Sequence, residues 1–343
     1  MRLPEPRGGV SEALVRALTG SPGTFVRPST TAVVDSSDEP WLDEDLQLSL
    51  WVLYELHYRG FDEVDPDWEW DPELLALRAG LEARFLDGLR AGVPVPVGSA
   101  SAGGSVAAAL TALTNADTGP SLSRFLQRKA TLAQFREFVV HRSIYHLKEA
   151  DPHSWGIPRL GGRPKAALIE IQADEYGGGR VERMHAELFR TTLDRLGLDT
   201  GYGAYLEHVS APTLATSNLI SLFGLHRRWL PALLGHLAAF EMTSSIPNRR
   251  YGNGLRRLGG DADATRFYDE HVTADAVHEQ IAAHDLCGGY VAEHPEQAGD
   301  VLFGAACGLH LDGVAAGWIL SRWERGTTSL RSPLTPDPLA ISA

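Results

Sequence analysis

The stretch IEIQADEYGGGRVERMH, residues 169–185, places three consecutive glycines inside an otherwise helical pattern. Each glycine inside a helix costs about 1 kcal/mol relative to alanine, so three in succession are expected to loosen or break the helix. Asp174 and Glu175 come immediately before the glycines, and Glu182 and His185 follow them. Carboxylates and a histidine on both sides of a deformable turn can wrap a metal ion. The alternative is a helix interrupted by a surface loop.

Helical patterns extend outward from this stretch in both directions. The pattern around the glycines runs from Lys165 to Leu196 and is ended by Gly197. Six further helices are predicted, over Leu46–Tyr58, Pro72–Ala91, Ser121 or Ser123 to about Lys148, Pro212–Leu225, His226–Ser244, and Ala262–His284, with a last one over Gln297–Arg325. Alternating strand patterns are nearly absent. The sequence therefore predicts an all-α fold in which the helices pack as a bundle.

Breaks in the helical pattern divide the chain. Residues 1–40 are rich in Pro, Gly, Ser and Thr and are expected to be mostly irregular. VPVPVGSASAGG (93–104) is a second break, and 151–163, with two prolines and a Gly-Gly pair, is expected to be a connecting loop. We expect an N-terminal extension over 1–115, an irregular lead-in plus helices packed on the bundle. The bundle then covers 116–330 and a C-terminal tail covers 331–343.

Composition and charge argue against two classes of binding partner, nucleic acids and membranes. The formal net charge is −13, and no stripe of Lys and Arg stands out, which argues against nucleic-acid binding. The first residues lack the apolar segment of a secretory signal, and no uninterrupted apolar run reaches about 18 residues, so no membrane partner is expected. Cys287 and Cys307 have no CxxC spacing and indicate a reducing compartment. We expect a cytoplasmic protein.

A second stretch, FYDEHVTADAVHEQ (267–280), places two imidazoles and a carboxylate on one helix face. At 3.6 residues per turn His271, Asp275 and His278 lie within about 60° of one another. Such a stripe is costly to bury without compensating charge, but it forms half of a site for a divalent transition metal. The alternative is a solvated polar face. Glu241, at the end of an apolar helix, is likewise either exposed or directed at an interior partner.

Together with EADPHSWGIPRL (149–160), these stretches resemble the haem-oxygenase-like di-iron oxidases, a group of iron-containing redox enzymes. The resemblance covers about residues 120–325 and implies a haem-oxygenase-like helical bundle. The family's ligand pattern falls on a set of carboxylates and histidines: Glu175, His185, Glu241, His271, Asp275 and His278. The resemblance implies Glu149 as a further carboxylate from the first core helix.

This resemblance also implies the chemistry. Two Fe(II)/Fe(III) ions would be the cofactor and O2 the co-substrate, and a peroxo-bridged diferric species would oxidise a small organic substrate. Relatives of this type act on amino acids and fatty acids by N-oxygenation, desaturation or C–C cleavage. Two Fe(II) ions bring four positive charges, which Glu149, Glu175, Glu241 and Asp275 would balance. We expect the substrate to enter between the helices of Glu175 and His271, beside the glycines.

Several alternatives compete with this reading. Glu182 and His185 have the E-x-x-H spacing of ferritin-like di-iron sites, and on an unbroken helix Glu182 would lie within about 20° of Glu175. A ferritin-like site needs two E-x-x-H units, whereas the helix that contains His278 has Asp-x-x-His, at 275–278. A haem oxygenase would leave the ligand cluster unexplained. A thiamine-degrading hydrolase would need Cys287 or Cys307 as nucleophile, and a non-catalytic helical binding module would hold no iron.

Three roles remain open for residues 1–115. They can fill out the bundle, form the contact of a homodimer or shape the substrate pocket. The other histidines, among them His57, His141 and His146, belong to no second ligand pattern. We interpret them as core or surface residues.

Overall fold

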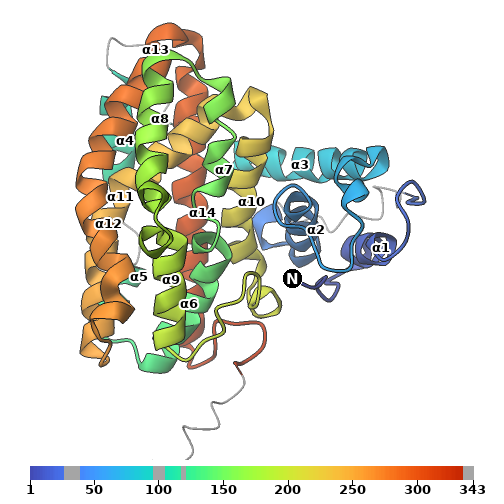
Figure 1. Ribbon diagram of the computed structural model, residues 1–343, viewed down its shortest axis with the longest axis horizontal. Helices are drawn as coiled ribbons and strands as arrows, with labels where there is room; N and C mark the ends of the chain where they lie inside the picture. Colours follow the sequence, from blue (N-terminus) through green and yellow to red (C-terminus); the bar gives the residue numbers. More distant parts are fainter. Residues whose placement is uncertain (27–38, 96–104, 117–120, 335–343) are drawn as a thin grey trace, which may run out of the picture.

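The computed structural model describes residues 1–26, 39–95, 105–116 and 121–334, except for the side chains of 274–276. The long helices that follow residue 130 run along a common direction and form a bundle (Figure 1). No strand occurs in the described ranges. The predicted all-α class is therefore confirmed.

Eleven segments make up the bundle and its rim: α4 (Val106–Asn115), α5 (Leu122–Arg128), α6 (Leu132–His146), α7 (Asp151–Ser154), α8 (Gly162–Glu175), α9 (His185–Arg195), α10 (Ala211–Leu225), α11 (Leu230–Arg257), α12 (Ala262–Gln280), α13 (Gly289–Glu293) and α14 (Ala298–Glu324). A π-helix over Ile281–Gly288 joins α12 to α13. Helix α11 is central, because it packs against α5, α12 and α14.

Helices α11 and α14 approach each other closely because glycines face the contact. A Cβ atom on Gly235 would lie 1.8 Å from the carbonyl oxygen of Val301, and one on Gly304 would lie 1.9 Å from that of Ala232. Real Cβ atoms do not come so close to backbone atoms. Glycine is therefore required at both positions of this crossing.

Helix α14 is the most apolar long helix of the described chain. By length and composition its segment Pro295–Glu324 is able to cross a membrane, and 44% of the apolar window is buried inside the protein. In the structure the helix packs against α10 and α11. A central helix of a bundle has the same composition, so the finding is weak evidence for a membrane span.

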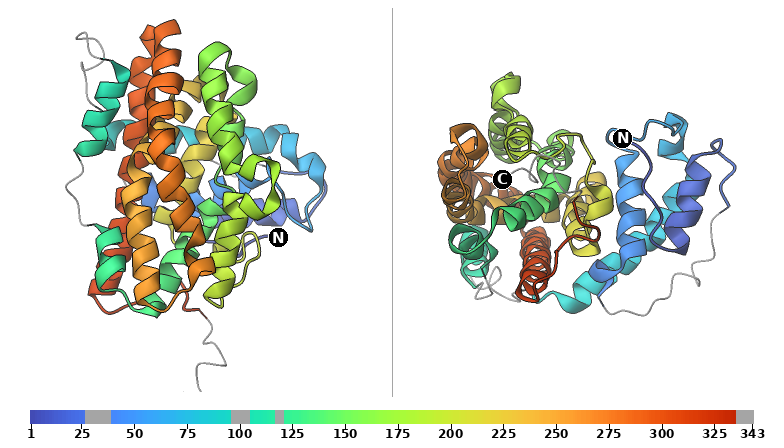
Figure 2. Two further views of the ribbon diagram at one scale, coloured as in Figure 1. Left: turned by 60° about the vertical axis from the view of Figure 1, so that its left-hand side comes forward. Right: turned by 90° about the horizontal axis from the view of Figure 1, so that it is seen from below.

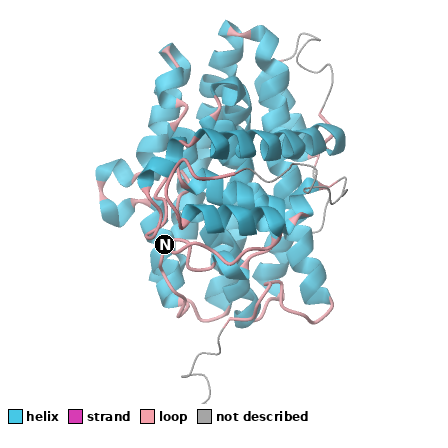
Figure 3. Ribbon diagram, turned by 90° about the vertical axis from the view of Figure 1, so that its right-hand side faces the viewer, coloured by secondary structure: helices cyan, strands magenta, loops and turns pink. Residues whose placement is uncertain are grey.

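The N-terminal helices lie beside the bundle. They are α1 (Gly9–Leu18), α2 (Glu44–Glu55) and α3 (Pro72–Gly92), and Figure 2 shows them together on one side. In Figure 3 they cross in front of the bundle helices. Helix α2 packs against α10, and its buried side chains, Trp51 among them, share one hydrophobic core with the bundle.

Some sequence-based boundaries are wrong. Residues 1–40 contain α1, although an irregular lead-in was expected. The single helix expected up to Lys148 is two helices, because Thr131 and Gln134 form a capping box that starts α6. The loop expected over 151–163 contains the short helix α7.

Candidate metal centre

The structure brings six of the seven predicted ligands together inside the bundle. Each comes from a defined place in the fold: Glu149 from the turn after α6, Glu175 from the last position of α8, His185 from the first position of α9, Glu241 from α11, and His271 and His278 from α12. Asp275 also lies on α12, but its side chain is outside the described part of the structure. Metal binding by these residues stays a prediction.

The glycine run explains how Glu175 and His185 meet. Gly177, Gly178 and Gly179 all have positive φ, so the chain turns sharply inside the helical pattern over 165–196. The break that the glycine run predicted in this pattern is confirmed. A Cβ atom on Gly177 would lie 2.6 Å from the backbone of Arg183 and Met184. The turn sets Nδ1 of His185 3.0 Å from Oε2 of Glu175.

The ligand atoms form two groups that share one carboxylate. Glu149, Glu175, His185 and His271 form the first group, and Glu175, Glu241 and His278 form the second. Within each group the ligand atoms all lie within 4.8 Å of one another. Donors on opposite sides of a first-row divalent ion are separated by roughly 4.2 Å, since each bond is about 2.1 Å long. Each group therefore needs only a small contraction to hold an ion.

Several of these atoms are buried and make no hydrogen bond of good geometry among the described residues. They are Oε2 of Glu149, Oε2 of Glu175, Nδ1 of His185 and Nδ1 of His278, and their nearest polar neighbours are other candidate ligands, with 3.0 Å between Glu175 and His185 and 3.4 Å between His278 and Glu241. A buried polar atom that is poorly paired costs up to about 1–3 kcal/mol. Four such atoms gathered in one place fit the coordination of a cation, and nitrogen and carboxylate oxygen donors together suit iron.

Backbone and side-chain partners orient two of the imidazoles. Nδ1 of His271 lies 2.8 Å from the carbonyl oxygen of Phe267, which can only accept, so Nδ1 carries the proton and Nε2 faces Glu149. Nε2 of His278 lies 2.9 Å from Oδ2 of Asp174, which leaves Nδ1 facing Glu241 at 3.4 Å. Hydrogen bonds of this kind hold the tautomer that a metal-binding histidine needs.

Two supporting residues were not assigned from the sequence. Nδ1 of His146, interpreted from the sequence as a core or surface residue, lies 3.0 Å from Oε1 of Glu149 and supports that carboxylate. Its spacing three residues before Glu149 is the signal that could have found it. Asp174 stands beside the glycine run in the sequence, but only the fold reveals its hydrogen bond to His278.

The electrostatics of the cluster favour a cation. Burial raises the pKa of Glu149, but the charge and hydrogen bond of His146 outweigh it and hold the pKa well below its usual range. Burial lowers the pKa of His278, but the Glu241 carboxylate 3.4 Å away outweighs it and raises the pKa to about 9. The Glu149 carboxylate thus remains ionised, and His278 carries a proton at neutral pH that a metal ion would displace.

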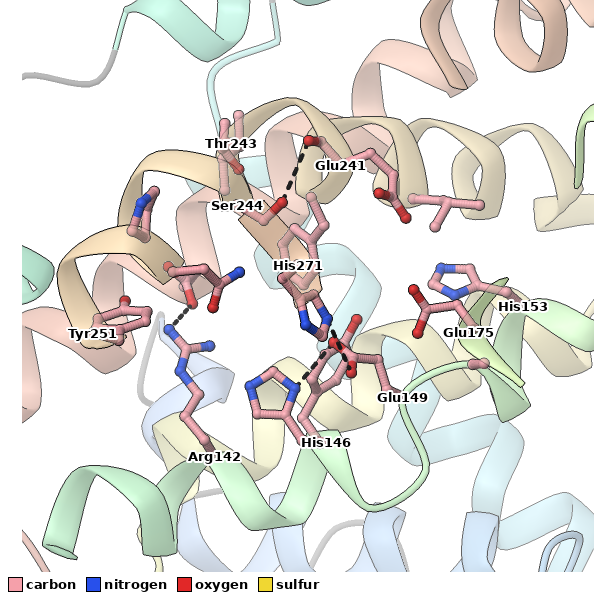
Figure 4. A pocket seen from close by; sticks show the side chains of 18 of the residues that line it. Arg142, His146, Glu149, His153, Glu175, Glu241, Thr243, Ser244, Tyr251 and His271 are labelled. Carbon is pink, nitrogen blue, oxygen red and sulfur yellow. Dashed lines mark hydrogen bonds and ion pairs between the residues drawn. The ribbon is translucent and has the colours of Figure 1, made fainter. Parts of the chain in front are cut away.

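A pocket of about 130 Å³ opens from this cluster along α6 and α11 (Figure 4). Tyr145, Phe240 and Asp312 line it together with Arg142, which Figure 4 shows on the side away from Glu175. Burial lowers the pKa of His153, another lining residue, to about 4, so its ring is neutral.

This pocket is lined by Gln172 and Glu175 of α8 and by His271 of α12, the two helices between which the substrate was expected to enter, but it does not lie beside the glycine run. None of the three glycines lines it. The rival ligand Glu182 lies on the short segment Val181–Arg183, where its side chain is exposed, and it belongs to neither ligand group. The geometry therefore favours Glu175 over Glu182.

The two cysteines do not form a nucleophilic site. Cys287 and Cys307 are both buried and unpaired with each other. Burial raises the pKa of Cys287 to about 12 and raises that of Cys307 as well. Both thiols stay protonated near neutral pH, which argues against the hydrolase alternative.

Comparison with known proteins agrees with the geometry. A family described as iron-containing redox enzymes matches residues 136–313, a region that contains both ligand groups. A nitrosourea synthase from Streptomyces achromogenes subsp. streptozoticus is 26% identical over 159 residues, which are 46% of this chain and 34% of the relative. The chain thus spans about a third of the length of that relative. The protein belongs to the iron-containing redox enzyme family and has a haem-oxygenase-like all-α fold.

Proposed function

We propose that this protein is an oxidoreductase that binds two iron ions and uses O2 to oxidise a small polar substrate. The observation that carries the proposal is the pair of buried ligand groups that share Glu175. A shared carboxylate is the arrangement needed to bind two neighbouring ions at once. The family match supports iron as the metal.

Charge balance supports two divalent ions. Glu149, Glu175 and Glu241 contribute three negative charges, and Asp275, on the same helix as His271, would add a fourth. Two Fe(II) ions neutralise four charges, which offsets much of the cost of burying them. In a single turnover O2 would accept four electrons, two from the ferrous ions and two from the substrate, and an external reductant would restore Fe(II).

The chain's own residues prepare the site for this reaction. Phe267 and Asp174 orient the imidazoles, so that Nε2 of His271 and Nδ1 of His278 face the carboxylates. Tyr145 and Phe240 line the pocket beside the cluster and limit the access of water. A substrate bound in this pocket would lie directly against the ligand groups.

The polar part of the pocket favours an amino-acid-like substrate over a fatty-acid-like one. Arg142 donates to Asp312 at 2.9 Å and also bonds Tyr251, so both signs of charge line one pocket. This arrangement suits a molecule with a carboxylate, an amino group or a guanidino group. A nitrosourea contains oxidised nitrogen, so the relative's name supports N-oxygenation ahead of desaturation or C–C cleavage.

Iron content is the first test. The protein is loaded with Fe(II) without oxygen, desalted, and exposed to air while oxygen consumption and the visible spectrum are followed. We expect close to two irons per chain and a coloured intermediate that rises and decays. No retained iron, together with no oxygen consumption in excess Fe(II), would overturn the proposal.

A substrate panel tests the second part of the proposal. Oxygen uptake of the iron-loaded protein, with ascorbate as reductant, is compared for amino acids, guanidino compounds and fatty acids of similar size. We expect stimulation by nitrogen-containing polar compounds and a hydroxylated or otherwise oxidised nitrogen in the product. Stimulation by fatty acids alone would contradict the polar-substrate assignment.

A further inference from the structure

The N-terminal extension reaches the bundle through a buried charge. Glu55 is the last residue of α2, and its side chain is completely buried. Its Oε2 lies 3.2 Å from Nζ of Lys148 and accepts a hydrogen bond from the hydroxyl of Tyr202 at 2.8 Å. The backbone N–H of Arg59 donates to Oε1 at 3.3 Å. Both carboxylate oxygens of Glu55 are therefore bonded.

Lys148 is held from the side of the extension. Only 3% of the residue is exposed. Its ammonium group lies 4.5 Å from the ring centre of Tyr58 and 5.3 Å from that of Trp51, and both aromatic residues belong to the extension. A buried lysine surrounded by two rings and one carboxylate has a fixed position.

The residue after Lys148 is Glu149, one of the candidate ligands. The turn that contains both connects α6 to α7 and has only four residues, 147–150. Its other side is held by Gln172 of α8, whose Nε2 donates to the carbonyl oxygen of Ala150 at 2.8 Å. The turn is thus fixed by the extension through Lys148 and by α8 through Ala150.

Loss of the Glu55 charge would leave an ammonium group buried without its partner. An unpaired buried charge costs several kcal/mol, so the lysine would move toward water or toward another carboxylate. Glu149 is its immediate neighbour in the chain. Either movement displaces the turn that presents Glu149 to His271.

We infer that Glu55 is a positioning residue for Glu149 and that it acts through Lys148. The N-terminal extension is then part of the metal centre, although it lies outside the region that matches the family. This inference rests on the proposed function, because it takes Glu149 to be an iron ligand.

The test measures metal affinity and stability in the full-length protein. Fe(II) is titrated without oxygen in competition with a coloured chelator, and thermal unfolding is followed separately. For Glu55→Gln we expect one of the two ions to bind about 10- to 100-fold more weakly, the usual effect of losing a group that supports a ligand. The second ion, bound through Glu241 and His278, should keep its affinity.

Glu82→Gln is the matched control. Glu82 is also a buried carboxylate of the extension, and its Oε2 lies 2.9 Å from Nε2 of His226 in the bundle. It therefore joins the same two parts of the protein, but it is not bonded to the turn of Glu149. We expect a comparable loss of thermal stability with both metal affinities unchanged.

The outcomes separate the two proposals. Absence of iron binding in the wild-type protein overturns the proposed function. Two ions bound with unchanged affinity by Glu55→Gln, in a protein whose wild type binds two, overturns only the positioning role.

A double variant covers the case in which Glu55→Gln does not fold. Glu55→Gln with Lys148→Met leaves no unpaired buried charge at this contact, and such replacements are often tolerated. The link from the extension to the turn is still missing, so we expect the weakened affinity to persist. Wild-type affinity for both ions in the double variant would overturn the inference.

Discussion

Glu175 belongs to both ligand groups, whereas Glu241 belongs to one. At the scale of single residues, this difference predicts that substitution of Glu175 causes a larger loss of bound iron than substitution of Glu241. We expect Glu175→Gln to retain less than one iron per chain after anaerobic loading and desalting, because it weakens both positions. Glu241→Gln should retain about one.

Glu182→Gln is the control for this pair, since Glu182 is exposed and belongs to neither group. It should retain as much iron as the wild type. Equal iron retention in the Glu175 and Glu241 variants would show that Glu175 is not shared between two ions.

At the scale of elements, the turn between α8 and α9 depends on one glycine more than on its neighbours. A side chain on Gly177 would meet the backbone at 183–184, just before His185, whereas a side chain on Gly178 would meet nothing within 4 Å. Both residues have positive φ, so alanine costs about 1–2 kcal/mol of backbone strain at either position.

We therefore predict that Gly177→Ala weakens iron binding by about tenfold or more, because moving one ligand commonly costs that much. Gly178→Ala should lower the melting temperature but change iron affinity much less. The measurement is the same chelator competition as above. Equal effects on affinity would mean that the steric contact at 183–184 does not set the position of His185.

The crossing of α11 and α14 gives a prediction about stability. Gly304→Ala places a methyl group against the carbonyl of Ala232, and such overpacking against backbone costs about 3 kcal/mol or more. Gly313→Ala, on the same helix, is exposed and meets nothing within 4 Å, so it should stabilise the protein by up to about 1 kcal/mol. Urea unfolding of the two variants measures the difference. Similar effects would contradict the close approach of the helices.

The sequence predicted most elements of the bundle because their apolar positions recur at helical spacing. Pro72 marks the beginning of α3, and the helix predicted over 297–325 agrees with α14 to within one residue at each end. Helix α1 was missed because Pro, Gly, Ser and Thr around it suggested irregular chain. The break at Thr131 was also missed, since the residues before it have ordinary helix propensity.

The candidate site was predictable where its pattern is local. Glu175, His185, His271 and His278 stand out by spacing around the glycine run and along α12. Their partners come from tertiary packing, which spacing does not report. The hydrogen bond from His278 to Asp174 joins residues far apart in the chain, and the pocket wall of α6 and α11 forms only in the folded bundle.

At the scale of the whole molecule, Glu137 links the bundle to the segment that follows α14. The carboxylate on α6 accepts hydrogen bonds from Nε1 of Trp323 at 2.7 Å and from the backbone N–H of Ser329 at 2.8 Å. Burial raises the pKa of Glu137, but these hydrogen bonds outweigh it and lower the pKa below its usual value. The chain after α14 is thereby fastened to α6.

A lowered pKa in the folded state makes this contact dependent on pH. Its contribution to stability is complete above the unfolded pKa of about 4.5 and disappears as the pH falls through the lower folded value. Glu137→Gln should therefore lower the free energy of unfolding by about 1–3 kcal/mol at pH 7 and flatten its decline below pH 4.5. Exposed Glu324→Gln is the control and should change neither. If the free energy of unfolding of Glu137→Gln declines below pH 4.5 as steeply as that of the wild type, Glu137 is not the source of this pH dependence.

The ion pair between Glu55 and Lys148 also limits how this protein can be recombined with its relatives. A chimera that joins a foreign bundle to this extension, or this bundle to a foreign extension, preserves the contact only if both charges are inherited together. We therefore expect the two parts to be exchangeable only together, even though the family match covers only the bundle. Exchange of substrate specificity among such enzymes should succeed by grafting pocket residues of α6 and α11, and should fail by swapping the segments before and after residue 115.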